Sequence, residues 1–404
     1  MPNILHGKRI LLGVTGSIAC YKAADLASRL TKEEAVVTAV LTQSACQFIS
    51  PLTFQSVTAQ RAYTDQDLWG SEGHVQHIGL GLGADLICIA PATANTIAKL
   101  AHGIADNLLT LASLAARCPV LVAPAMDGGM FGHPATQANI EMLQNRAVYL
   151  AGPAEGRMAS GLVGRGRMLE PLELLGHIRY LLSREGKLRG THIVVTAGGT
   201  AEPIDAVRAI TNRSSGKQGF ALAQSALDYG ADVTLISANS PLPTPIGAQR
   251  VDVSSAQEML TAVLQAIESA DALIMAAAVA DFQPIASSSQ KIKKEDGIPE
   301  IKLTLTPDIL AAVAQMRSHS TSPRVVIGFA AESTDLIENA RRKLTNKKLD
   351  LIVANDITAP DSGFTVDTNR VVLLDASGNV DKYPLMSKAE VAELVIQRLI
   401  KLLE

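Results

Sequence analysis

The chain has 404 residues, of which 47% are hydrophobic and 19% are charged. This balance excludes a disordered or fibrous protein, and the length suggests two or three domains of about 100–200 residues each. Lys and Arg number 36 against 39 Asp and Glu, and aromatic residues make up only 3%. We therefore expect no nucleic-acid partner, because such partners favour a strongly basic face or a platform of aromatic rings.

The cysteines and the N-terminus indicate where the protein works. Four cysteines lie in the first third of the chain, and none forms a CxxC pair. Four widely spaced thiols in a large chain do not indicate a disulfide scaffold, so we expect a reducing, cytoplasmic compartment. The opening MPNILHGKRI lacks the pattern of a signal peptide, and no run of about 18 apolar residues occurs. We expect no membrane association.

In the first half, short apolar runs alternate with longer amphipathic stretches. Residues 9–14, 36–42, 84–90 and 120–125 have the character of strands, and 17–30, 93–101 and 107–116 that of helices. This alternation predicts βαβ units, in which a parallel sheet carries helices on both faces.

The pattern restarts after a charged, glycine-containing interval at 183–190. We expect strands at 192–197, 233–237, 272–278, 325–330 and 351–354, a hairpin within 369–385 and a terminal helix at 388–403. The strand that starts at 272 reads as buried up to Asp281. We therefore predict two α/β domains with mainly parallel sheets, a flavodoxin-like or Rossmann-like one at 1–189 and a Rossmann-like one at 190–404.

The first strand ends in a turn suited to a phosphate. Gly13 and Gly16 permit a tight turn, and Ser17 can cap the helix that follows. The N–H groups at a helix N-terminus attract anions. Taken alone, such a turn is as often structural as ligand-binding.

Two further strand ends in this half carry polar loops. Ligands of open α/β sheets bind at the carboxyl ends of the strands, so these loops would meet at one edge. The residues concerned are Thr42 and Ser44 after the second strand, Pro91, Ala92, Thr93 and Asn95 after a later one, and Asp106 and Asn107 at the start of a helix. Together they indicate a binding site more strongly than any one loop does.

Motifs across residues 8–175 carry a family resemblance. GVTGSIACYKA, HIGLGLGADLICIAPATANTIAKLAHGIADNLL and APAMDGGMF, followed by GRMASGLVGRGRML, resemble the flavin-dependent cysteine decarboxylases. The match is closest to the N-terminal half of the bifunctional coenzyme A biosynthesis proteins, which join phosphopantothenoylcysteine decarboxylase to phosphopantothenate–cysteine ligase. The resemblance implies FMN as cofactor, bound by Gly16, Ser17, Ile18, Thr42, Ser44, Pro91, Ala92, Thr93, Asn95, Asp106 and Asn107.

The implied reaction converts 4′-phosphopantothenoylcysteine to 4′-phosphopantetheine. A carboxylate on a saturated carbon has no electron sink, and oxidation of the neighbouring CH2–SH group by FMN creates one. By resemblance, His77 in QHIGL is the catalytic histidine, whereas His74 lies outside the motif.

Two positions depart from the family pattern. Asp127 replaces the asparagine of PAMN, which binds the substrate carboxylate, and an ionised Asp127 would repel that group. Ser160 replaces the proton-donating cysteine of the lid motif, and a hydroxyl is far less acidic than a thiol. We expect FMN binding to be intact and decarboxylation to be impaired.

These departures leave two alternatives to a fully bifunctional enzyme. In the first, the chain is an active ligase that carries a structural FMN domain. In the second, it is a flavoprotein that acts on another thiol or carboxylate.

The second half opens with a glycine-rich strand–helix junction. Gly198 and Gly199 follow the strand, and the loop 212–217 leads into a helix with Gly219 and Ala223 on its packing side. This layout is Rossmann-like and can receive phosphates. Short-chain dehydrogenases share such a turn, but they need a Tyr-x-x-x-Lys pair. No tyrosine of this half is followed by a lysine at that spacing, which argues strongly against a dehydrogenase.

Residues 190–400 resemble the ligase partner of the same family. The resemblance places catalytic roles on Lys291, the first lysine of KIKK, which supports acyl-nucleotide formation, and on Asn212, which holds the intermediate. It implies CTP binding by Met275, Asp281, Lys291, Pro307, Asp308, Ile309, Leu310, Phe329, Lys343 and Lys347. Lys343 and Lys347 are four residues apart, so one helix would present both ammonium groups on one face.

The implied ligase reaction has two steps. The carboxylate of 4′-phosphopantothenate attacks the α-phosphate of CTP, which gives an acyl-cytidylate and pyrophosphate. The amine of cysteine then displaces CMP. The first step brings anions together and needs cations, which we expect to be Mg2+ on the phosphates and Lys291. The family also implies a homo-oligomer of trimeric flavin domains and dimeric ligase domains, up to a dodecamer.

Overall fold

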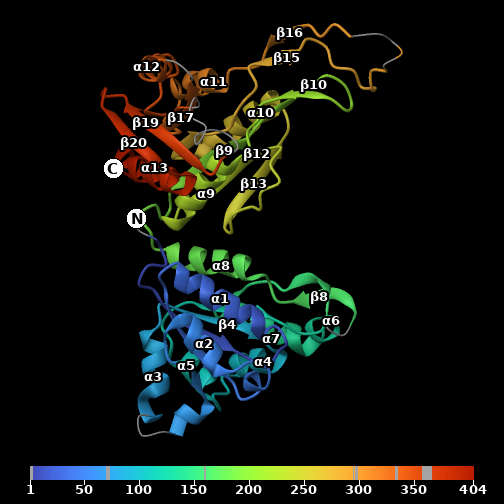
Figure 1. The fold of residues 1–404 in the computed structure, drawn as a ribbon, viewed down its shortest axis with the longest axis vertical. Helices are drawn as coiled ribbons and strands as arrows, with labels where there is room; N and C mark the ends of the chain where they lie inside the picture. The colour runs from blue at the N-terminus through green and yellow to red at the C-terminus, as the bar shows by residue number, and fades with distance from the viewer. Residues whose placement is uncertain are drawn as a thin grey trace. The chain divides into compact units, whose positions relative to one another are not determined.

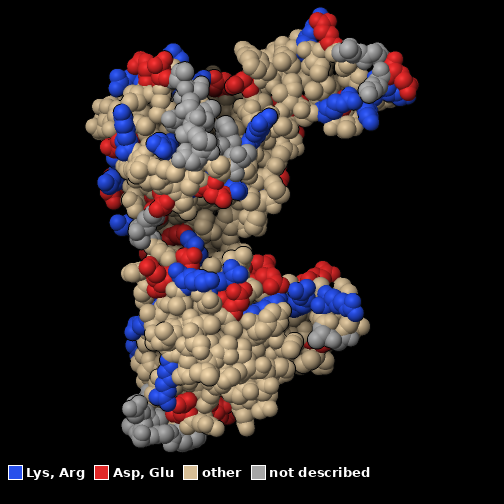
Figure 2. Space-filling model, viewed as in Figure 1, with Lys and Arg blue, Asp and Glu red and all other residues tan. Residues whose placement is uncertain are grey.

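The computed structural model describes residues 3–69, 73–158, 161–293, 295, 299–332, 335–356 and 366–404. The chain forms two compact units, Pro2–Ser183 and Arg184–Glu404 (Figure 1). None of the described helices is long and apolar enough to cross a membrane. On the visible face of the molecule, Lys and Arg are interspersed with Asp and Glu (Figure 2).

A six-stranded parallel sheet forms the centre of the first unit. Its order is β3-β2-β1-β4-β5-β6, and the bounds are β1 (Arg9–Val14), β2 (Val36–Leu41), β3 (Tyr63–Thr64), β4 (Leu86–Ala92), β5 (Val120–Pro124) and β6 (Tyr149–Leu150). This is the strand order of the dinucleotide-binding Rossmann fold, and it reverses between β1 and β4. In open α/β sheets, ligands bind at the carboxyl ends of the strands at such a reversal, here where the chain leaves β1 and β4.

Helices cover both faces of this sheet. Alternate residues of β1 divide between two apolar clusters, because successive side chains of a strand point to opposite faces. Leu12 packs in the cluster with α1 (Cys20–Lys32), α2 (Pro51–Thr58) and α8 (Pro171–Ser183). Leu11 packs in the other, with α4 (Ala94–His102), α5 (Leu108–Ala115) and α7 (Pro134–Asn145). The remaining elements are α3 (Gly73–Gly83), α6 (Gly128–Phe131), β7 (Ala154–Arg157) and β8 (Val163–Arg167).

The second unit has an eight-stranded sheet in the order β13-β12-β9-β14-β17-β18-β19-β20. The strands are β9 (His192–Gly198), β12 (Asp232–Ala238), β13 (Ala248–Val253), β14 (Ala272–Met275), β17 (Val325–Glu332), β18 (Leu351–Asp356), β19 (Thr368–Asp375) and β20 (Val380–Ser387). The strands from β13 to β18 pair in parallel and repeat the Rossmann order, whereas β19 and β20 add antiparallel strands.

The helices of this unit are α9 (Lys217–Asp228), α10 (Ala256–Ala266), α11 (Ile309–Arg317), α12 (Leu336–Asn346) and α13 (Lys388–Leu403). Two antiparallel pairs lie outside the main sheet, β10 (Ala201–Pro203) with β11 (Ala209–Thr211) and β15 (Phe282–Pro284) with β16 (Leu303–Leu305). We call residues 201–212, 281–293 and 303–305, which contain these two pairs, the arm. Figure 1 shows β10, β15 and β16 extending away from the sheet.

The predicted α/β class and parallel sheets are confirmed, and β1 and α13 have the predicted bounds. The prediction that the strand from 272 continues to Asp281 is wrong, because β14 ends at Met275. The N–H groups of Ala276 and Ala277 both donate to the hydroxyl of Thr196, at 3.1 Å, and leave the pattern of the sheet. The domain boundary at residue 189 stays a prediction.

Candidate functional site

Thr15 joins the loops that follow β1 and β4 in the first unit. Its buried hydroxyl donates to the carbonyl of Pro91 at 2.7 Å and accepts from the N–H of Thr93 at 3.0 Å. The carbonyl of Pro91 also accepts from the N–H of Thr15 at 3.3 Å. Two of the predicted cofactor-binding residues, Pro91 and Thr93, are therefore fixed at the point where the strand order reverses. The sequence analysis did not select Thr15, although it lies between Gly13 and Gly16 in the predicted turn.

Close packing brings the loop after β2 to the same place. A Cβ atom at Gly16 would lie 2.5 Å from the Cβ of Ser44, so only glycine fits this approach. Thr42 directly follows β2 and donates its N–H to the carbonyl of Val14 at 3.1 Å. Gly16, Thr42 and Ser44 are thus neighbours at one sheet edge, as predicted.

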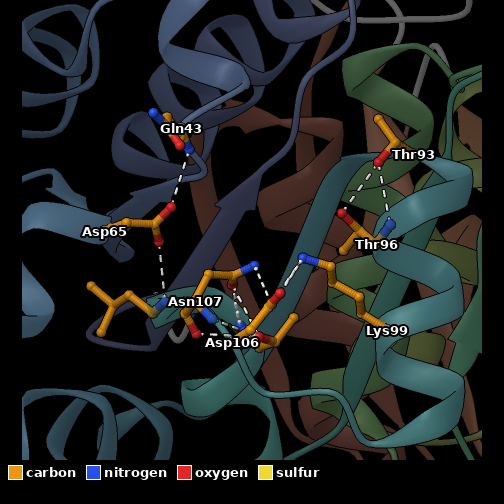
Figure 3. A network of polar contacts seen from close by, with 9 residues as sticks. Gln43, Asp65, Thr93, Thr96, Lys99, Asp106 and Asn107 are labelled. Carbon is orange, nitrogen blue, oxygen red and sulfur yellow. Dashed lines mark hydrogen bonds and ion pairs between the residues drawn. The ribbon is translucent and has the colours of Figure 1, made fainter.

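Asp65 connects this edge to the start of α5 (Figure 3). One carboxylate oxygen accepts from the N–H of Gln43 at 3.2 Å, and the other accepts from the N–H of Leu108 at 3.1 Å. Asn107 caps α5 by accepting from the N–H of Thr110 at 2.9 Å. Asp65 was not among the predicted residues. The feature of the sequence that could have indicated Asp65 is its position directly after the short strand β3.

The start of α4 completes this network. Thr93 is its N-cap and accepts from the N–H of Thr96 at 3.3 Å. Lys99 donates to both carboxylate oxygens of Asp106 at 2.8 Å (Figure 3). The hydrogen bond from Lys99 holds the pKa of Asp106 below its usual value. Asn95 is exposed in the first turn of α4, and Ser17 and Ile18 lie in the loop before α1, with Ile18 62% exposed.

His77 lies on α3, away from these loops in the sequence. Its ring Nδ1 is buried and has no hydrogen-bond partner among the described residues. Buried polar atoms are nearly always hydrogen-bonded, so an exception needs an explanation such as a missing ligand. This orphaned nitrogen, and the polar loops that meet where the strand order reverses, fit a bound cofactor.

Asp127 occupies the N-cap of α6, where its carboxylate accepts from the N–H of Gly129 at 3.0 Å. Asp and Asn are equally good N-caps, which explains why this local structure tolerates either residue. The side chain borders a cavity of about 470 Å³ that Phe131, Met158 and Arg165 also line. Arg165 stacks over the ring of Phe131, with 5.6 Å from its guanidinium carbon to the ring centre. Ser160 lies outside the described residues.

The glycine-rich junction of the second unit is a place of close approach. A Cβ at Gly219 would lie 2.5 Å from that of Ala197, so α9 packs directly against β9. Gly198 has a φ of +85°, and a Cβ there would lie 1.9 Å from the carbonyl oxygen of Ala238. Asn212 follows β11, and its amide donates to the carbonyls of Ala278 and Val279 at 3.2 and 3.0 Å.

Most of the other predicted ligase residues lie beside β15, at the start of α11 and on the strands β14 and β17. Asp281 and Lys291 are exposed on either side of β15, in the arm. Pro307, Asp308, Ile309 and Leu310 lie at the start of α11, Met275 ends β14, and Phe329 is half-buried within β17. Among the described residues, no group of three or more His, Cys, Asp or Glu side chains could hold a metal ion.

Asp308 links the start of α11 to the end of α12. It caps α11 by accepting from the N–H of Ala311 at 3.0 Å and forms an ion pair with Lys347. Burial raises the pKa of Asp308, but the hydrogen bonds from Lys347 and Ala311 outweigh it and leave the pKa below its usual value. Lys343 lies in the last turn of α12, and Lys347 is the C-cap residue. The structure thus joins two of the sequence segments that were predicted to contact CTP.

Two sheets of Rossmann order, each with polar loops at the carboxyl ends of its strands, define a two-domain α/β protein of the Rossmann class. Residues 2–183 match the family model described as Flavoprotein, and residues 188–403 match that of the DNA/pantothenate metabolism flavoprotein C-terminal domain. The coenzyme A biosynthesis bifunctional protein CoaBC of Bacillus subtilis (strain 168) is 43% identical over 399 residues, which cover 98% of this chain and 97% of that protein. The chain belongs to the CoaBC family.

A further relative and a solved structure are also similar to this chain. A cysteine/cysteine sulfinic acid decarboxylase from an unknown prokaryotic organism is 43% identical over 364 residues, which cover 88% of this chain and 99% of that protein. The solved C-terminal domain of a CoaBC protein is 37% identical and covers 54% of this chain and 98% of its own, with a TM-score of 0.46. The family assignment rests on the sequence similarity.

Proposed function

We propose that this protein catalyses two steps of coenzyme A biosynthesis. The second unit ligates 4′-phosphopantothenate to cysteine at the expense of CTP, and the first decarboxylates the product, 4′-phosphopantothenoylcysteine, to 4′-phosphopantetheine. The observation that carries this proposal is the similarity to a bifunctional protein over 98% of the chain. It favours two activities over an active ligase with a silent flavin domain.

In the first unit, FMN would be held by the loops that Thr15 and Asp65 connect. The N-terminus of α4 offers N–H groups for a phosphate, and Thr93 and Asn107 fix where α4 and α5 begin. When bound, FMN supplies the oxidation that turns the cysteine carboxylate into a leaving group. His77 would exchange a proton with the substrate through its orphaned Nδ1.

The substrate carboxylate would lie in the cavity beside Asp127. Repulsion by this residue is the reason to expect slow decarboxylation, but Arg165 also lines the cavity, with its guanidinium over the ring of the lining residue Phe131, and can offset the charge. Asp127 also keeps one oxygen on the N–H of Gly129. We therefore propose that the first unit decarboxylates its substrate with Asp127 in place of asparagine. The role of Ser160 stays a prediction.

In the second unit, Lys291 would stabilise the charge that develops as the carboxylate attacks the α-phosphate of CTP. Mg2+ would arrive with the nucleotide, on its phosphates. The start of α11 and the end of α12, joined through Asp308, would contact CTP. Asn212 would hold the acyl-cytidylate for attack by the amine of cysteine.

We propose self-association as well. The arm exposes large apolar side chains, with Val207 67%, Phe282 51% and Leu305 72% exposed. Exposed apolar surface of this kind favours burial against a second copy. This supports paired ligase units, and the family pattern adds trimeric flavin units. Sedimentation of the whole protein would test the assembly.

Separate assays of the two half-reactions test the proposed function. The ligase assay follows CTP-dependent pyrophosphate release with 4′-phosphopantothenate, Mg2+ and cysteine. The decarboxylase assay follows CO2 from 4′-phosphopantothenoylcysteine, with flavin absorbance as evidence that the cofactor is bound. Activity in both is expected. Pyrophosphate release without CO2 would instead support the silent flavin domain.

A second candidate substrate for the first unit is cysteine itself or its sulfinic acid. It is favoured by the relative that bears these substrates in its name and is 43% identical to this chain. The decarboxylase assay distinguishes the two candidates when free cysteine replaces 4′-phosphopantothenoylcysteine at equal concentration.

A further inference from the structure

Asp205 lies at the tip of the β10–β11 hairpin and has a fully buried side chain, 0% exposed. Its neighbours are exposed, Val207 to 67% and the side chain of Arg208 to 48%. Charged side chains are rarely buried unless they are paired. A buried carboxylate at the tip of a projecting hairpin therefore needs hydrogen-bond partners, and its burial needs a structural explanation.

The partners occupy both carboxylate oxygens. Oδ1 accepts from the N–H groups of Val207 and Arg208, both at 2.8 Å, which closes the turn of the hairpin. Oδ2 accepts from Nη1 of Arg208 at 2.9 Å and from the N–H of Ile292 at 3.2 Å. A carboxylate has about four acceptor positions, and here each is used. These hydrogen bonds, led by that from Val207, hold the pKa of Asp205 below its usual value.

The bond to Ile292 reaches out of the hairpin to the segment that carries Lys291. Arg208 supports it by donating to the carbonyl of Ile292 at 3.4 Å. The same segment is attached a second time, by the N–H of Ser288 on the carbonyl of Ile204 at 3.0 Å. Lys291 is exposed, and the backbone on either side of it is held against the hairpin tip.

The base of the same hairpin carries the other residue of the ligase reaction. β11 ends at Thr211, and Asn212 follows with its amide on the carbonyls of Ala278 and Val279. One short hairpin thus sets the position of Asn212 at its base and of Lys291 at its tip.

We propose that Asp205 is a positioning residue for formation of the acyl-cytidylate: its Oδ2 fixes the backbone beside Lys291 and so holds that ammonium group where the nucleotide binds. This rests on the proposed ligase function. Asp205 acts through Lys291 and does not itself touch the substrate.

Asp205→Asn tests this role with a minimal change. The amide oxygen can still accept from Val207 and Arg208 and close the turn, but its NH2 group cannot accept from Ile292 or from the guanidinium. We expect CTP-dependent pyrophosphate release to fall about tenfold or more in kcat, with a smaller change in the KM for CTP and a melting temperature lowered by a few degrees, because two donors lose their acceptor.

Asp375→Asn is the matched control. Asp375 also closes a hairpin turn, accepting from the N–H groups of Ser377 and Asn379 at 3.0 Å and from the Asn379 amide at 2.9 Å. All of these partners lie within the β19–β20 turn itself. Asp375→Asn is expected to release pyrophosphate at the wild-type rate.

The double variant Asp205→Asn/Lys291→Gln shows whether Asp205 acts through Lys291. Residues that act as a unit give non-additive effects, so the double variant should be no slower than Lys291→Gln alone. Independent, multiplying losses would overturn the proposal, as would a wild-type rate for Asp205→Asn when Lys291→Gln is impaired.

Two further outcomes are decisive. If Asp205→Asn does not fold, Ser288→Pro removes the second backbone attachment and leaves the turn of Asp205 intact. Ser288→Ala is its control, because both variants lose the hydrogen bonds between the Ser288 hydroxyl and Gln290. A loss in kcat for Ser288→Pro but not for Ser288→Ala supports the proposal, and a wild-type rate for Ser288→Pro, or an equal loss in both, contradicts it. A wild-type protein without CTP-dependent pyrophosphate release overturns the ligase function, and this inference with it. A defect in Lys291→Gln alone overturns only the inference.

Discussion

The two units share one strand order but hold their proposed reactive groups in different ways. In the first, polar side chains brace the loops at the sheet edge itself: Thr15 joins the loops after β1 and β4, and Asp65 joins those after β2 and before α5. In the second, Asn212 and Lys291 lie on an arm outside the sheet, whose parts Asp205 ties together.

This difference corresponds to what each proposed reaction requires. A flavin performs the difficult step itself, so the protein mainly has to hold it in a fixed orientation, and a rigid sheet edge does so. The ligase reaction must bring together a nucleotide, a carboxylate and an amine in turn. Groups on an arm can meet such substrates from outside the sheet, but they need their own attachments.

The largest effect is expected at the arm. Lys291→Gln should lower CTP-dependent pyrophosphate release about a hundredfold to a thousandfold, because it removes a group that stabilises charge in the transition state. Lys302→Gln, an exposed lysine of the same part of the chain, is the control and should have the wild-type rate. Normal release by Lys291→Gln would show that this lysine is not the reactive one.

Asn212→Asp tests the second ligase step. We expect pyrophosphate release to continue while amide formation slows about tenfold to a hundredfold, since a hydrogen bond to a charged group contributes about 1.5–3 kcal/mol. Quenched-flow mass spectrometry should then show the acyl-cytidylate accumulating. If pyrophosphate release and amide formation fall together, Asn212 has no separate role in the second step.

Thr15→Val tests the brace of the first unit. The change leaves the N–H of Thr93 without its buried acceptor, so the free energy of unfolding of this unit should fall by about 1–3 kcal/mol. Urea unfolding measures it, and flavin retention should weaken with it. Thr38→Val, at a half-buried position of β2, is the control and should change stability by less than about 0.5 kcal/mol. Equal effects of the two variants would contradict a bracing role for Thr15.

The smallest effect is expected from Asp106→Asn. Its ion pair with Lys99 is partly exposed, so it contributes well under about 1 kcal/mol at pH 7. Because the folded pKa of Asp106 is lowered, this contribution is present above the unfolded value of about 3.9 and is lost as the pH falls through the folded pKa. Urea midpoints of variant and wild type should converge between pH 7 and pH 3. A difference that grows on acidification would have the wrong sign.

Local patterns predicted much of the fold. The apolar run 9–14 predicted the bounds of β1, and the capped amphipathic stretch 388–403 predicted those of α13. Both patterns are local, because they depend on residues that are neighbours in the sequence. The strand predicted up to Asp281 failed because the hydroxyl of Thr196, far away in the sequence, binds the N–H groups of Ala276 and Ala277.

Some residues of the candidate sites could likewise be selected from the sequence, and others could not. Gly16, Ser44 and Asn107 could be selected from motifs because glycines, caps and strand ends have local signatures. Thr15, Asp65 and Asp205 could not, since each acts through a partner more than one element away along the chain, and a single polar residue at a turn carries no sign of such a partner.

One measurement tests the assignment of two activities most directly. The purified protein, loaded with FMN, is incubated with 4′-phosphopantothenate, cysteine, CTP and Mg2+, and the products are followed by mass spectrometry. The account predicts that 4′-phosphopantetheine forms, with one CMP and one pyrophosphate released for each molecule. Accumulation of 4′-phosphopantothenoylcysteine without CO2 release would contradict it.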